Sequence, residues 1–170
     1  MYDIENYYNA ETIKEAVTLQ KEHPDARVIS GGSDVLIKIR EGKMAGTSLV
    51  SIRDIKEIKG IRQMESGDIY IGAGTTFSHV TNDPVIQKLI PVLGEAVDQV
   101  GGPQVRNIGT IGGNVCNGAV SADSAPTLFS LNAMLQIHLT RSQIKIPDGN
   151  HPSTSSICDP QHGIQRKKYE

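Results

Sequence analysis

Two glycine clusters, far apart in the sequence, carry residue types that could bind an anion. They are Ser30–Asp34, which reads S-G-G-S-D, and Thr110–Asn114, which reads T-I-G-G-N. A glycine pair that follows a short apolar run lets backbone amides converge on a phosphate, because glycine has no Cβ and can adopt a positive φ. The two clusters together predict a site that holds one pyrophosphate group from two sides.

The first cluster alone is weak evidence, because most glycine pairs only make turns. Its order of strand, glycine pair, hydroxyl and carboxylate is more informative, since the loop amides and the Ser33 hydroxyl can donate to phosphate oxygens. A carboxylate is a poor neighbour for phosphate, so Asp34 is expected to hold amides of its own loop. The spacing matches neither G-x-G-x-x-G nor G-x-x-x-x-G-K-[ST], which argues against Rossmann and P-loop sites.

Short strands and helices must position these clusters. Apolar character predicts a strand over 27–30, leading into the first cluster, and another over 48–52. Thr12 with Glu15 forms a capping-box pattern that predicts a helix up to Pro24.

Later segments lead to the second cluster in the same way. Alternation predicts a strand over 69–71, and Thr75 or Thr76 can cap the helix that follows. An apolar stripe at helical spacing, closed by a glycine pair, predicts a helix from about Pro91 to Val100. A half-buried strand is predicted over 133–139.

Composition restricts the class of protein. With 170 residues, 38% of them hydrophobic and 21% charged, the chain can bury one core or two small lobes. The formal net charge is −2 and Lys and Arg are scattered, which argues against nucleic acid and a membrane as partners. No targeting segment or spanning stretch is recognisable, so a cytoplasmic location is expected. Cys116 and Cys158 are expected to be two reduced thiols, and no metal site is predicted.

Three motifs in order carry a family resemblance. They are R-x-x-S-G-G-S-D at 27–34, Q-V-R-N-x-G-T-I-G-G-N at 104–114 and S-x-D-S-A-P at 121–126. Together they resemble the FAD-binding subunit of the molybdenum hydroxylases, in particular the xanthine dehydrogenase group, over residues 1 to 139. The resemblance implies an α+β fold of the PCMH type, in which FAD lies between a small N-terminal α/β lobe and a second α+β lobe.

The resemblance also implies which residues contact FAD. The amides of the first cluster would bind the pyrophosphate, the second cluster would lie under the pyrophosphate, Asp123 would accept hydrogen bonds from ribose hydroxyls, and Val100 would line the same pocket. The implied set is Arg27, Val28, Ile29, Ser30, Gly31, Gly32, Ser33, Asp34, Val100, Thr110, Ile111, Gly112, Gly113, Asn114 and Asp123. No catalytic acid or base is implied, because the cofactor carries the chemistry.

Function and partners follow from the same resemblance. Purine hydroxylation would occur on a molybdenum cofactor in a separate subunit, and electrons would pass through a 2Fe-2S subunit to FAD and then to NAD or oxygen. The chain would be the FAD-dependent oxidoreductase subunit of such a complex.

Residues 1–55 are expected to form the first lobe and 56–139 an incomplete second lobe, followed by a poorly ordered polar tail over 140–170. The tail departs from the family, which leaves open a truncated, inactive flavodomain remnant. A flavoenzyme similar to UDP-N-acetylenolpyruvoylglucosamine reductase is a third hypothesis, which the Q-V-R-N and S-x-D-S-A-P surroundings disfavour.

Overall fold

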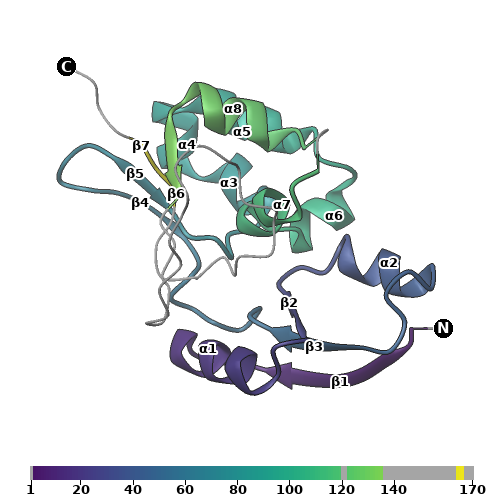
Figure 1. Ribbon diagram of the computed structural model, residues 1–170. Helices are drawn as coiled ribbons and strands as arrows, with labels where there is room; N and C mark the ends of the chain where they lie inside the picture. Colours follow the sequence, from purple (N-terminus) through teal and green to yellow (C-terminus); the bar gives the residue numbers. More distant parts are fainter. Residues whose placement is uncertain (1, 120–121, 136–163, 167–170) are drawn as a thin grey trace, which may run out of the picture.

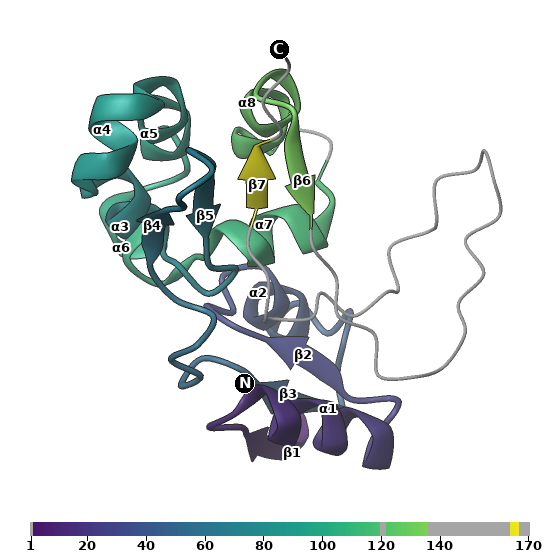
Figure 2. The ribbon, with the colours of Figure 1, turned by 90° about the vertical axis from the view of Figure 1, so that its left-hand side faces the viewer.

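The computed structural model describes residues 2–119, 122–135 and 164–166 (Figure 1). The described elements are organised around two separate sheets, one from the N-terminal segment and one from later segments. In Figures 1 and 2 the N-terminal sheet lies below a group of helices, and the two parts meet near α2 (Val35–Arg40) and α7 (Ile111–Asn117). This mixture of helix and sheet confirms the predicted α+β class.

The N-terminal sheet is parallel, with strand order β1-β3-β2. Parallel neighbours need a crossover connection, and helices supply it here. The strands are β1 (Ile4–Asn9), β2 (Arg27–Ile29) and β3 (Thr47–Ser51), and α1 (Ile13–Glu22) joins β1 to β2 as α2 joins β2 to β3. The predicted strands at 27–30 and 48–52 are confirmed to within one residue at each end.

Helix α1 begins where the capping pattern predicts. Thr12 Oγ1 accepts a hydrogen bond from the amide of Glu15 at 3.2 Å, and the Glu15 carboxylate accepts one from the amide of Glu11 at 2.8 Å. These bonds satisfy amides that a helix end would otherwise leave unpaired. The helix then buries its apolar face in an N-terminal core made of Ala10, Ile13, Ala16, Ile52, Ile55 and Ile58.

The predicted lobe boundary at residue 55 stays a prediction. Ile58 is fully buried in the N-terminal core, while the next strand, β4 (Ile61–Gln63), belongs to the second sheet. The change from one core to the other thus falls between residues 58 and 61.

The second sheet is antiparallel, with order β4-β5-β7-β6. Its other strands are β5 (Ile69–Ile71), β6 (Ala133–Leu135) and β7 (Ile164–Arg166). Residues 136–139 of the predicted strand lie outside the described residues. So does the predicted polar tail, except for 164–166, which form a strand and not the disordered segment expected.

In the described part of the chain, six short helices pack beside this sheet. They are α3 (Phe77–Asn82), α4 (Pro84–Leu89), α5 (Pro91–Asp98), α6 (Pro103–Ile108), α7 and α8 (Ser124–Ser130). A proline opens each of α4, α5 and α6, where its missing N–H costs nothing. The predicted α5 stripe is confirmed at Leu93 and Val97, which are fully buried, but Val92 is about half exposed.

Among the described residues, no helix is both long and apolar enough to cross a membrane.

Candidate functional site

The first glycine cluster connects β2 to α2. Ile29 is buried, and its carbonyl accepts a hydrogen bond from the amide of Ile52 at 2.9 Å, which fixes the end of the strand. The chain then turns at Gly32, whose φ is +78°. An L side chain rarely adopts this conformation, and a Cβ here would also lie 2.9 Å from Ile29 Cδ1. The turn therefore requires glycine.

The amides of this cluster are free to bind a ligand. Within the described part of the chain, the backbone N–H groups of Gly31, Gly32, Ser33 and Asp34 donate to no acceptor. Asp34 occupies the N-cap position of α2, but its carboxylate accepts no capping hydrogen bond. The prediction that Asp34 holds the amides of its own loop is therefore wrong. The consequence is a run of four adjacent donors, as an anion site requires.

The second glycine cluster is the first turn of α7 and not a loop. Thr110 is its N-cap: Thr110 Oγ1 accepts from the amide of Gly113 at 3.1 Å, and the Thr110 carbonyl accepts from the amide of Asn114 at 3.0 Å. A small hydroxyl followed by residues that tolerate close packing is typical of a helix start.

The remaining amides of the second cluster are also bonded within the protein. The amide of Gly112 donates to Ala73 O at 2.9 Å, and the amide of Ile111 donates to Thr75 O at 3.0 Å. A Cβ on Gly112 would lie 2.6 Å from Ala73 O, so only glycine allows this approach. All four amides from Ile111 to Asn114 thus have acceptors, and the anion donors expected here are already used.

Thr75 organises the segment on which the second cluster rests. Its side chain is 1% exposed, and its hydroxyl accepts from the amide of Gly60 at 2.9 Å and donates to the Gly60 carbonyl at 3.2 Å. Thr76, its neighbour, caps α3 as predicted, by accepting from the amide of His79.

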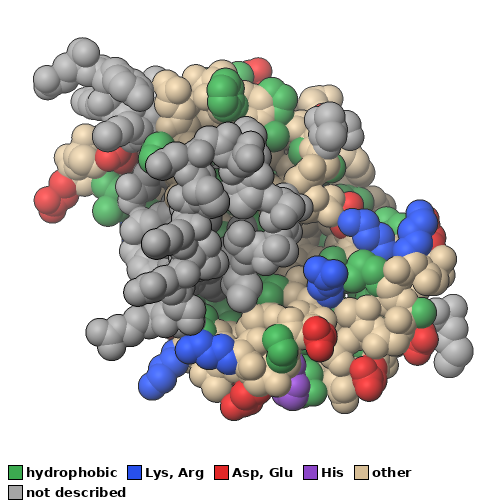
Figure 3. Space-filling model, viewed as in Figure 1, with side chains coloured by type: hydrophobic (Ala, Val, Ile, Leu, Met, Phe, Trp, Pro, Cys, Tyr) green, Lys and Arg blue, Asp and Glu red, His purple; other side chains and the backbone are tan. Residues whose placement is uncertain are grey.

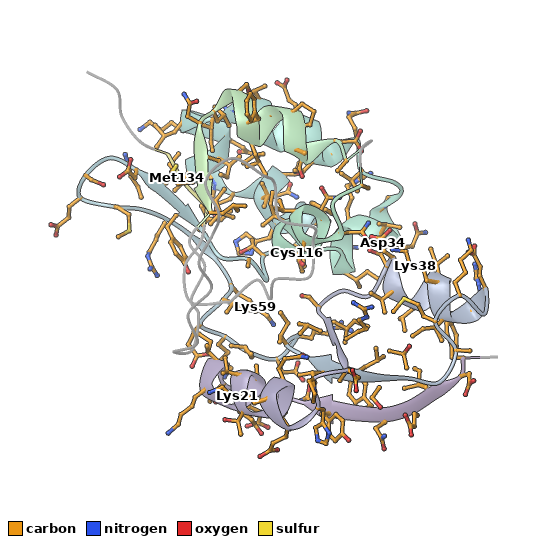
Figure 4. All side chains as sticks on the ribbon, in the orientation of Figure 1. Lys21, Asp34, Lys38, Lys59, Cys116 and Met134 are labelled. Carbon is orange, nitrogen blue, oxygen red and sulfur yellow. The ribbon has the colours of Figure 1, made fainter. Side chains whose placement is uncertain are left out.

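The two clusters meet across the contact between the two parts of the fold. A Cβ on Gly31 would lie 1.9 Å from the carbonyl oxygen of Ile108 and 3.0 Å from Gly109 Cα, immediately before the second cluster. Nearby, Lys38 Nζ donates to Asn117 Oδ1 at 3.1 Å, from α2 to α7. Figure 4 shows Asp34 and Lys38 on the side of α2 that faces the helices above.

Positive charge lies on the helix that follows the first cluster. The last turn of α2 carries Lys38 and Arg40. In the face shown in Figure 3, Lys and Arg side chains collect over this helix. Positive charge on this part of the surface favours the approach of an anion.

The other predicted residues lie at varied depths. Arg27 is exposed at the start of β2, while Val28 packs against the N-terminal core and Val100 against the core of the helical part. Ile111 is fully buried and its amide donates to Thr75 O, so neither its side chain nor its amide is available to a ligand. Asp123 is exposed at the start of α8, and its carboxylate makes no capping bond.

Sequence reasoning missed the residues that support the second cluster. Ser124 is fully buried, and its hydroxyl donates to Asn114 Oδ1 at 2.5 Å. The only available signal was its position beside Asp123 in the third motif. Ala73 and Thr75 support the cluster through their carbonyl oxygens; Thr75 was predicted only as a possible helix cap, and Ala73 was marked only by its neighbours Gly72 and Gly74.

The cysteine prediction is wrong where the structure tests it. Cys116, on α7, is disulfide-bonded and is not a reduced thiol. Cys158 lies outside the described residues.

A protein-family model matches most of the chain. It is described as the FAD binding domain in molybdopterin dehydrogenase, and it matches residues 2–150.

Curated relatives and solved structures agree with this match. The xanthine dehydrogenase FAD-binding subunit of Escherichia coli O157:H7 is 37% identical over 158 residues, 92% of this chain and 54% of its own. The nicotinate dehydrogenase FAD-subunit of Eubacterium barkeri is 34% identical over 87% of this chain and 51% of its own. Reconstituted CO dehydrogenase from Oligotropha carboxidovorans aligns with a TM-score of 0.79 and 25% identity, over 95% of this chain and 58% of its own. The chain thus spans about half the length of the curated relatives it matches.

Proposed function

The chain belongs to the family of FAD binding domains in molybdopterin dehydrogenases, and from this premise we propose that it carries electrons in a xanthine dehydrogenase-like molybdenum hydroxylase. FAD is its cofactor. In the proposed complex a separate subunit holds the molybdenum cofactor and hydroxylates a purine, and a 2Fe-2S subunit delivers electrons. Bound FAD would supply the transfer of these electrons to NAD or oxygen, and the complex would be cytoplasmic.

The free amides of the first cluster are the observation that carries this proposal. Four adjacent N–H groups, from Gly31 to Asp34, have no acceptor within the described residues, and they lie where two parts of the fold meet. The FAD pyrophosphate offers negatively charged acceptors, which adjacent backbone amides can bind. Charge-assisted hydrogen bonds of this kind are among the strongest that a backbone makes. The residues present therefore fit the cofactor.

The proposed site uses the two clusters differently. The first cluster binds the pyrophosphate through its amides and the Ser33 hydroxyl. The second cluster has no free amide, so it contributes shape through Gly112 and Gly113 and polar atoms through the Thr110 and Asn114 side chains. Asp123, exposed and uncapped, accepts hydrogen bonds from the ribose hydroxyls.

This chain binds and orients, and it needs no proton-transferring side chain of its own. When bound, the flavin ring takes up and releases electrons. Gly31 lies so close to Ile108 that a Cβ would be 1.9 Å from its carbonyl oxygen, and this close approach would hold the two clusters at one separation around the cofactor. The remaining predicted contacts, from Arg27 to Ser30 and at Val100 and Ile111, would complete the walls of the site.

Retention of FAD by the purified chain tests the proposal. The chain is mixed with FAD, excess cofactor is removed by gel filtration, and the visible flavin absorbance is compared with the protein concentration. A ratio near one flavin per chain is expected, and Asp123→Ala combined with Gly113→Val should abolish it. Circular dichroism of each protein shows whether it is folded. A colourless but folded wild-type chain would overturn the proposal.

The electron acceptor is tested on the same sample. The flavin is reduced under anaerobic conditions, and NAD⁺ or oxygen is then added. Recovery of the oxidised flavin absorbance identifies the acceptor, and no recovery with either would contradict the proposed electron path.

A further inference from the structure

Ser124 is a buried residue whose hydroxyl bonds to the second glycine cluster. Its side chain is fully buried, and the hydroxyl donates to Asn114 Oδ1 at 2.5 Å. Ser124 lies on α8 and Asn114 on α7. A buried hydroxyl rarely goes without a partner, and this one is bonded to the second glycine cluster.

This bond decides which way the Asn114 amide points. Since the oxygen accepts from Ser124, the amide nitrogen Nδ2 is directed away from it. Nδ2 donates to no acceptor within the described ranges. An amide nitrogen carries two donors, and a half-buried one gains by finding an acceptor.

The same face of α7 is directed toward α2. Asn117 lies three residues after Asn114, and residues at this spacing are neighbours on one helix face. Asn117 accepts a hydrogen bond from Lys38 on α2, the helix that begins at the first cluster. Asn114 therefore lies between Ser124 on one side and the proposed FAD site on the other.

We propose that Ser124 is a positioning residue for FAD: it fixes the Asn114 amide so that Nδ2 donates a hydrogen bond to the cofactor. This inference rests on the proposed function and adds to it a residue that does not itself contact FAD. Without the Ser124 hydroxyl the amide can rotate by half a turn and present its oxygen to an acceptor group, which is repulsive. Ser124 thus acts on FAD only through Asn114.

A double-mutant cycle tests this dependence. The dissociation constant for FAD is measured by flavin fluorescence for the wild-type chain, Ser124→Ala, Asn114→Ala and the double variant. Ser124→Ala should weaken FAD binding about threefold to tenfold, the effect of one neutral hydrogen bond. In the Asn114→Ala background the same change should have no effect, because its only route is gone. Ser130→Ala on the same helix, where the exposed hydroxyl bonds only Thr127 O, is the matched control.

A second variant keeps the inference testable if Ser124→Ala folds poorly. Asn114→Asp preserves an oxygen that accepts from Ser124 but replaces the donor by an anionic oxygen, and it should weaken FAD binding by at least about 100-fold. Equal effects of Ser124→Ala in both backgrounds would mean that Ser124 only packs α8 on α7, and would overturn the inference. Unchanged FAD binding by Asn114→Asp would also overturn it. If the wild-type chain binds no FAD, the proposed function fails and this inference fails with it.

Discussion

Gly31→Ala should separate the two glycine clusters without unfolding either part of the chain. The new Cβ would lie 1.9 Å from the carbonyl oxygen of Ile108, whereas real Cβ atoms almost never approach within 3.0 Å. The contact must therefore open by about 1.1 Å, the difference between these two distances. Both atoms are tied to backbone, so neither can move aside as a flexible side chain could.

A displacement of this size should remove the hydrogen bonds that need both sides of the site. With the pyrophosphate held by the amides of the first cluster, its hydrogen bonds near 2.9 Å with the Thr110 and Asn114 side chains would stretch to roughly 4 Å, well beyond hydrogen-bond range. If two bonds to a charged group are lost, at about 1.5–3 kcal/mol each, FAD binding weakens by about 3–6 kcal/mol. This corresponds to a dissociation constant raised roughly 10²-fold to 10⁴-fold.

Fluorescence titration with FAD measures this change, and thermal unfolding followed by circular dichroism reports stability. The matched control is Gly46→Ala, because Gly46 has φ +69° and nothing within 4 Å of an added Cβ. This control should cost about 1–2 kcal/mol in stability through backbone strain and leave FAD affinity unchanged. A folded Gly31→Ala variant that binds FAD within threefold of wild type would refute the reasoning.

Three further substitutions test the structural support of the second cluster, the proposed ribose contact and the bond between α2 and α7. Thr75→Val should lower the free energy of unfolding by about 1–3 kcal/mol, because the part-buried N–H of Gly60 loses its acceptor, while the Gly60 carbonyl keeps the amide of Gly72 as a donor. Urea unfolding measures this change, and an unchanged midpoint would contradict the role of Thr75. Asp123→Asn should weaken FAD binding about tenfold at unchanged melting temperature, since the exposed carboxylate makes no capping bond; titration and melting on one sample check both. Lys38→Met removes the exposed hydrogen bond to Asn117 and should change the free energy of unfolding by less than about 1 kcal/mol. A larger loss in a denaturant titration would contradict this expectation of a weak surface bond.

Local sequence patterns predicted the elements that local chemistry determines. Thr12 caps α1, as its capping-box spacing to Glu15 indicated, and Thr76, one of two predicted candidates with Thr75, caps α3. The strand that leads into the first cluster was also predicted, because a short apolar run that ends at a glycine pair is typical of a buried strand. These features depend on contacts between residues close in sequence.

Features that depend on distant residues were predicted poorly. The second cluster was expected to be an anion-binding loop, but Ala73 and Thr75 take up its amides and it becomes a helix start. The sequence of residues 110–114 does not indicate that carbonyl oxygens some forty residues earlier accept from its amides. Asp34 was expected to hold its own loop, yet its carboxylate makes no capping bond. The hydrogen bond from Ser124 to Asn114 likewise depends on the packing of α8 beside α7, which the sequence around Ser124 does not indicate.

The unequal hydrogen bonding of the two clusters also sets how their amides exchange with deuterium. The amides of residues 111–114 have internal acceptors, so they can exchange only when the surrounding fold opens. Those of residues 31–34 have none within the described chain, so they can exchange from the native state. A bound pyrophosphate would slow exchange in the first cluster alone. Occupancy of the site would thus be recorded by one short peptide, while the peptide that carries the second cluster would serve as the internal reference.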